Sequence, residues 1–138
     1  MSSATRIVAL RYAMIATGLI FVFGIYPLTQ LWPSGWSWGA GHSHYIAMII
    51  GVYATLGACL IAAAKDPLAS RSLIWFTVWS STVHAGVMAA EAVMDPAETG
   101  HFLGDVPALL LVAVALAVLT PRGATVIALG DRGVRRAA

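Results

Sequence analysis

The strongest indication of structure in this chain is residues 72–95, SLIWFTVWSSTVHAGVMAAEAVMD. As an α-helix the segment is about 35 Å long and almost wholly apolar, which is enough to cross the hydrocarbon core of a bilayer. It carries His84 near its middle and Glu91 seven residues later, on the same helical face. Hydrocarbon offers such groups no hydrogen-bond partner, so this face must contact protein or water. The same polar face also includes Thr77, Ser80, Ser81, Met88 and Asp95.

The overall composition is that of a membrane protein. Of the 138 residues, 59% are hydrophobic and only 10% are charged, whereas soluble domains carry about a quarter charged residues. Each of four apolar runs is close to the roughly 20 residues that a transmembrane helix needs. We therefore predict an all-α, polytopic membrane protein, an antiparallel four-transmembrane-helix bundle that forms a single domain over residues 1–138. Its spans are expected near residues 7–28, 44–64, 72–94 and 100–120.

The charged residues predict how these spans are oriented. If the spans alternate, all eight Lys and Arg residues fall on one side, an asymmetry typical of cytoplasmic loops and termini. We expect both termini in the cytoplasm. The pI of about 9.0 then follows from topology, and we expect no nucleic-acid partner. Four of the six acidic residues lie toward the other side: Glu91, Asp95, Glu98 and Asp105.

Histidines and carboxylates are expected to meet at the outer ends of the antiparallel spans. His42 and His44 stand where the second span begins, and His101 and Asp105 where the fourth begins, while His84 lies one to two turns deeper. Imidazole and carboxylate groups suit zinc, iron or copper. The leading hypothesis is a transition-metal site that opens to the extracytoplasmic side. Its candidate ligands are His42, His44, His84, Glu91, His101 and Asp105.

The second span carries a face of mostly small or polar residues. Gly51 and Thr55 are four residues apart, a spacing typical of close helix packing. We therefore expect this face to point inward, and with it His44. The face consists of His44, Met48, Gly51, Thr55 and Ala58.

The outer loop before the fourth span has a structural interpretation of its own. Asp95, Pro96 and Glu98 have the spacing of a helix cap, which gives both carboxylates a role without chemistry. Counted from residue 106 to residue 120, the fourth span reaches only about 22 Å. Either residues 101–104 also lie within the membrane, or the bilayer thins locally.

Three other functions remain open. In one, His84 pairs with His44 or His101 as axial ligands of haem b in an electron carrier, although His84 lies deeper than the others. In another, His84 and Glu91 relay protons or line a path for small solutes. In the third, His84 only hydrogen-bonds a neighbouring helix, and the protein is an accessory subunit of a larger membrane complex or a homo-oligomer. Whether the protein is an enzyme is left undecided, because nothing indicates an open coordination position.

Three runs of the sequence resemble a known family. They are GHSHYIAMIIGVYATLG (residues 41–57), RSLIWFTVWSSTVHAGVMA (71–89) and GHFLGDVPALLLVAVALAVLTPR (100–122). They are similar to a bacterial family of small four-helix membrane proteins catalogued as a domain of unknown function. The resemblance implies an inner-membrane protein and carries no activity or functional residue with it.

Overall fold

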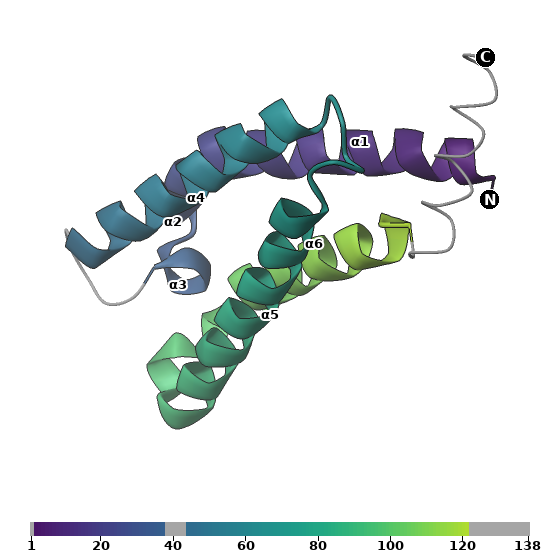
Figure 1. Ribbon diagram of the computed structural model, residues 1–138. Coiled ribbons are helices and arrows are strands. Elements are labelled where there is room, and N and C mark those ends of the chain that lie inside the picture. Colours follow the sequence, from purple (N-terminus) through teal and green to yellow (C-terminus); the bar gives the residue numbers. More distant parts are fainter. Residues whose placement is uncertain (1, 38–43, 122–138) are drawn as a thin grey trace, which may run out of the picture.

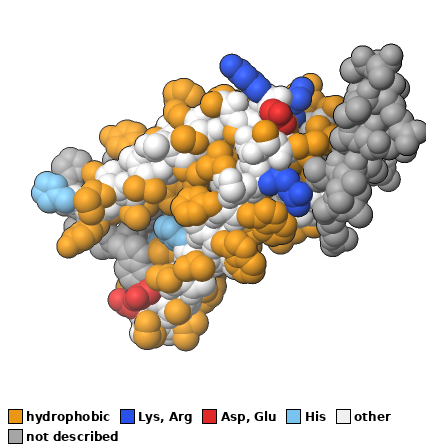
Figure 2. Space-filling view, in the orientation of Figure 1, with side chains coloured by type: hydrophobic (Ala, Val, Ile, Leu, Met, Phe, Trp, Pro, Cys, Tyr) orange, Lys and Arg blue, Asp and Glu red, His pale blue; other side chains and the backbone are white. Residues whose placement is uncertain are grey.

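The computed structural model describes residues 2–37 and 44–121, and over these ranges every element is helical. Four helical segments are long and apolar enough to cross a membrane, which confirms the predicted all-α class and the four spans. The protein is therefore a multi-pass membrane protein. Figure 2 shows hydrophobic side chains over most of the visible face, with Lys and Arg side chains gathered toward one end. The four segments are Ser3–Leu31, His44–Ala63, Arg71–Met94 and Pro96–Leu119.

The first span is composite. It consists of α1 (Ser3–Leu19), a π-helical turn η1 (Ile20–Gly24) and α2 (Ile25–Leu31). The hydroxyl of Ser2 accepts a hydrogen bond from the Thr5 N–H at 3.2 Å and so caps the first turn. A short helix, α3 (Pro33–Trp36), follows at the far end.

The other three spans are more regular. Helix α4 (His44–Ala63) is joined by a short turn to α5 (Arg71–Met94). The fourth span consists of a 3-10 helix, η2 (Pro96–Phe102), followed by α6 (Asp105–Leu119). As the sequence predicts, Asp95 caps η2, because its side chain accepts a hydrogen bond from the Ala97 N–H at 2.9 Å. Helix α6 has only 15 residues, so the segment before it completes the span.

The spans are arranged as two pairs. Helix α1 packs against α4 and helix α5 against α6, whereas α4 and α5 barely touch. Figure 1 shows the two pairs diverging toward the end that carries α3. We call this the acidic end, because it carries Glu91, Asp95 and Glu98. The opposite end, near the N-terminus and the α4–α5 turn, is the basic end, and it carries Arg6, Arg11, Lys65 and Arg71.

A fully buried apolar core that all four spans share lies toward the basic end. All four spans contribute a side chain with no exposed surface there: Leu10, Met14, Leu60, Ile74 and Leu116. Two arginines of α1 reinforce this contact. The Arg6 guanidinium donates to the Val118 carbonyl, and that of Arg11 donates to the Lys65 carbonyl at 3.1 Å. Helices α4 and α5 are thus held together through the core at the basic end and separate toward the acidic end.

Close backbone contact between α1 and α4 depends on Gly18 and Gly57. A Cβ on Gly57 would lie 2.6 Å from the Gly18 carbonyl oxygen, and one on Gly18 would lie 2.7 Å from that of Gly57. The predicted inward face of the second span is wrong. A Cβ on Gly51 would meet no atom of the described residues within 4 Å, and the whole set His44, Met48, Gly51, Thr55 and Ala58 is exposed. The inward face of α4 is the one that carries Gly57, because there the backbone of α1 comes into contact.

Candidate functional site

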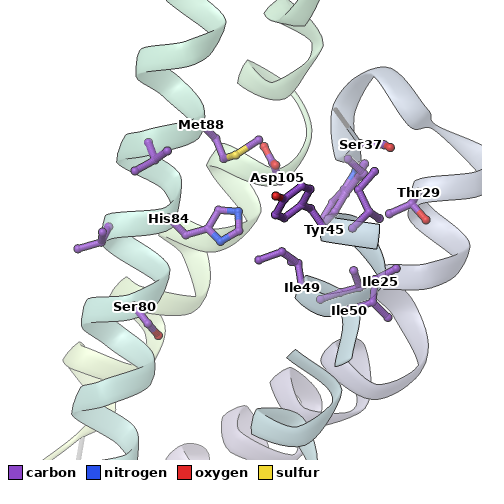
Figure 3. A pocket seen from close by; sticks show the side chains of 14 residues that line it. Ile25, Thr29, Ser37, Tyr45, Ile49, Ile50, Ser80, His84, Met88 and Asp105 are labelled. Carbon is purple, nitrogen blue, oxygen red and sulfur yellow. The ribbon is translucent and has the colours of Figure 1, made fainter. Parts of the chain in front are cut away.

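A cavity of about 660 Å³ occupies the space between the two helix pairs at the acidic end. Its wall comes from α2, α3, α4 and α5, with one residue from the start of α6. Most of the lining is apolar. Figure 3 shows isoleucines of α2 and α4 on one side and α5 on the other. Such a volume and lining are typical of sites that hold small molecules.

The cavity opens sideways between α4 and α5. Tyr45 and Ile49 of α4 line it and are 75% and 45% exposed, and Val83 and Val87 of α5 line it and are 63% and 53% exposed. In a spanning bundle, these apolar positions on the outer faces of two helices border lipid. The opening between them therefore leads to the bilayer.

His84 points into the cavity from α5 (Figure 3). Its Nδ1 lies 2.9 Å from the hydroxyl of Tyr53 on α4, one of the few links between these two helices. Tyr53 packs in turn against Phe21 of η1. The two rings meet edge to face, with their centroids 4.8 Å apart. The other ring nitrogen of His84, Nε2, makes no hydrogen bond within residues 2–37 and 44–121. Tyr53 thus orients the ring and leaves one nitrogen for another partner.

A second polar group forms where η2 joins α6. His101 has no exposed surface, and its Nδ1 lies 3.0 Å from Asp105 Oδ2. Its Nε2 lies 3.3 Å from Glu98 Oε2. Two carboxylates therefore flank one imidazole inside the fourth span. The two carboxylates give the buried imidazole polar partners that neither water nor lipid supplies at this position.

Asp105 connects this group to the cavity. The residue is 6% exposed and lines the cavity wall. Its Oδ2 faces His101, whereas no side chain of the described residues hydrogen-bonds to its buried Oδ1. The Trp36 Nε1–H, on the wall formed by α3, is also buried without a partner among these residues. Two residues of the cavity wall thus each have a buried polar atom that no side chain of the described residues satisfies.

Two hydroxyl groups of the lining are satisfied by their own helices. The Thr29 hydroxyl donates to the Tyr26 carbonyl at 2.7 Å, and that of Ser80 donates to the Thr77 carbonyl at 3.2 Å. They require nothing from a bound molecule. Unused hydrogen-bonding capacity remains at His84, Asp105 and Trp36.

Backbone contact between α3 and η2 fixes the end of the cavity. A Cβ on Gly104 would overlap the Gly35 carbonyl oxygen, and one on Gly100 would overlap that of Ser34. A side chain at either glycine would push these segments apart. The two glycines therefore hold Trp36 and Asp105 on neighbouring walls.

The six predicted metal ligands do not form one group. His101 and Asp105 are in contact, and His84 faces the same cavity as Asp105. His44 and Glu91 are exposed, at the start of α4 and near the end of α5. His42 lies outside the described residues. Within residues 2–37 and 44–121, no three His, Cys, Asp or Glu side chains are grouped so that they could hold a metal ion.

Zinc, iron or copper binding therefore stays a prediction, and haem b likewise. The described geometry agrees with one part of the structural alternative, since His84 does hydrogen-bond a neighbouring helix.

Sequence reasoning missed Tyr53, Trp36 and the role of Glu98 at His101. Trp36 was one of several aromatic residues in a loop, where a position at the membrane boundary is the commoner explanation. Tyr53 gave a usable signal, because a tyrosine within an apolar span needs a hydrogen-bond partner for its hydroxyl. His84 was the available partner.

Comparison with known proteins places the chain in a family. Residues 4–137 match the family described as "Family of unknown function (DUF6632)", and the chain belongs to it. No curated protein and no solved structure matches the chain.

Proposed function

We propose that this member of the DUF6632 family binds a small lipophilic molecule in the cavity between its two helix pairs. The molecule enters from the bilayer between α4 and α5, and its polar group contacts His84 and Asp105. One observation carries the proposal: an apolar cavity of about 660 Å³ is lined by Asp105, whose buried Oδ1 no side chain of the described residues satisfies. A buried acceptor without a partner costs about 1–3 kcal/mol, which a ligand donor can recover.

The charge asymmetry of the sequence supports an orientation for this site. All eight Lys and Arg residues fall on one side if the spans alternate, so we place both termini in the cytoplasm and the acidic end outside. The cavity then lies in the outer half of the plasma membrane. A lipophilic molecule in the outer leaflet has direct access to its opening.

The binding of a lipophilic probe tests the proposal. The protein is reconstituted in phosphatidylcholine vesicles with a photoreactive, alkyne-tagged dodecanol, and the labelled peptides are identified by mass spectrometry. Labelling of the cavity wall that excess unlabelled dodecanol abolishes is the expected result. Uniform labelling of lipid-facing positions, unaffected by competitor, would contradict the proposal.

Two tryptophan substitutions on α4 provide a matched pair. Ile49 lines the cavity, whereas Val52 is 63% exposed and does not. Because a tryptophan fills space that the probe needs, Ile49→Trp should lower competable labelling about tenfold, a loss of about 1.4 kcal/mol. Val52→Trp should leave it unchanged, and equal effects of the two substitutions would show that the probe binds elsewhere.

A further inference from the structure

We propose that the cavity selects a cationic amphiphile, a lipophilic molecule with a protonated amine head group, and that Asp105 is its counter-ion. The inference rests on the proposed function and specifies the ligand class of the same site.

The position of Asp105 is the first argument. The side chain lines the cavity and is nine-tenths buried, its Oδ2 is taken by His101, and no side chain of the described residues donates to its Oδ1. Figure 3 shows the carboxyl group of Asp105 directed into the same space as the ring of His84. An ammonium group in the cavity would donate to Oδ1 in a charge-assisted hydrogen bond, which is stronger than a bond between neutral groups.

The balance of charge is the second argument. Glu98 and Asp105 flank a single imidazole, that of His101, so the ring can compensate at most one of the two carboxylates. None of the Lys and Arg side chains that the structure describes lines the cavity, and these residues lie at the opposite end. In low dielectric an uncompensated carboxylate attracts a cation and repels an anion strongly.

The other neighbours of Asp105 agree with a cation. His84 of α5 and Tyr53 of α4 are the titratable groups that act on it from facing helices, in addition to His101 on its own span. Tyr45 and Trp36 line the same cavity as Asp105. Aromatic faces attract ammonium groups by cation–π interaction.

The apolar opening accounts for the rest of the ligand. With the head group at Asp105, an alkyl chain would lie along the isoleucines of α4 and the valines of α5 and leave between the helices. The alkyl chain would stay in an apolar environment along its whole length, and only the charged head group would contact a polar group of the protein.

Four probes that share one photoreactive dodecyl chain test the head-group preference. They carry a primary amine, a trimethylammonium, a hydroxyl and a carboxylate, and they are compared at pH 7 in neutral phosphatidylcholine vesicles, where the amine is protonated. The expected order of competable cavity labelling is amine, then trimethylammonium and alcohol, then carboxylate. The amine should exceed the alcohol by about tenfold, since only the amine offers both charge and a donor. Equal labelling by the amine and the alcohol would overturn the inference in the wild-type protein, with no variant needed.

The substitution Asp105→Asn removes the charge and keeps the shape and an acceptor for His101. It should lower amine labelling about tenfold and change alcohol labelling by less than about twofold. Glu91→Gln, which removes an exposed carboxylate at the same end, is the matched control and should change neither. Unchanged amine labelling of Asp105→Asn would overturn the role of Asp105. If no probe labels the cavity at all, the proposed function itself fails, whereas equal labelling by all four leaves that function standing and removes only the selectivity.

Discussion

The basic end and the acidic end of this bundle are built from the same four spans but are packed differently. At the basic end Leu60 of α4 and Ile74 of α5 have no exposed surface, and Arg6 of α1 bridges the pairs through the Val118 carbonyl of α6. At the acidic end the same two helices separate around a cavity, and Tyr53 and His84 form one of the few links across it. The difference places fully buried core contacts between α4 and α5 at one end and the cavity at the other.

The comparison also explains why polar residues are tolerated inside an apolar bundle. Buried polar side chains at the acidic end are either paired, as His101 is, or belong to the cavity wall, as Asp105 does. A fully packed acidic end would have to satisfy these groups internally. Leaving them beside a cavity makes their satisfaction depend on a ligand.

The largest effect on stability should come from Leu60→Ala. This side chain is fully buried where all four spans meet, so the substitution leaves a void and should lower the free energy of unfolding by about 2–5 kcal/mol. Ile49 lines a space that is already open. The matched substitution Ile49→Ala should therefore lower the free energy of unfolding by less than about 1 kcal/mol. Unfolding of the purified protein by sodium dodecyl sulfate measures both, and similar losses would show that the two ends are equally packed.

The glycines of α4 should give effects of opposite sign. Gly57→Ala places a Cβ against the Gly18 carbonyl and should destabilise by about 1–3 kcal/mol, because two backbones must move apart. Gly51→Ala meets no atom of the described residues and should stabilise the helix by about 0.5–1 kcal/mol. The same unfolding titration distinguishes them. A harmless Gly57→Ala would mean that α1 and α4 are not in close backbone contact.

The smallest effect is expected at the link across the cavity. Tyr53→Phe removes the hydroxyl that contacts His84 Nδ1. It should lower the free energy of unfolding by about 1 kcal/mol, the net contribution of a typical hydrogen bond. Tyr12→Phe, at a position 68% exposed, is the control and should have no effect on unfolding. The nitrogen-15 chemical shifts of the His84 ring should also change in Tyr53→Phe only, and an unchanged ring would contradict the contact.

Length and hydropathy were sufficient to predict the four spans from sequence. The predicted second and third spans, residues 44–64 and 72–94, agree with α4 and α5 to within one residue at each end. The first span extends beyond its prediction at both ends, because a polar cap at Ser2 begins it early and α2 continues it. Helix boundaries in water depend on capping, which hydropathy does not register.

The candidate site could be predicted only in part. His101 and Asp105 are four residues apart on one segment, so local spacing brings them together. Glu91 shares a helical face with His84 but is exposed, whereas its neighbour Ala92 is buried. Gly51 and Gly57 both offer a small surface, and only the partner helix decides which one is used. Such choices depend on tertiary neighbours that no single span encodes.

The π-helical turn Ile20–Gly24 has a consequence for the geometry of the cavity wall. A π-turn holds one residue more than an α-helical turn, so the residues beyond it are rotated by about 100° around the helix axis relative to an uninterrupted α-helix of the same length. Ile25 and Thr29, which line the cavity from α2, both follow this turn. The π-turn therefore decides which side of α2 forms this wall: if the first helix were uninterrupted at the same length, a different side of α2 would face the cavity.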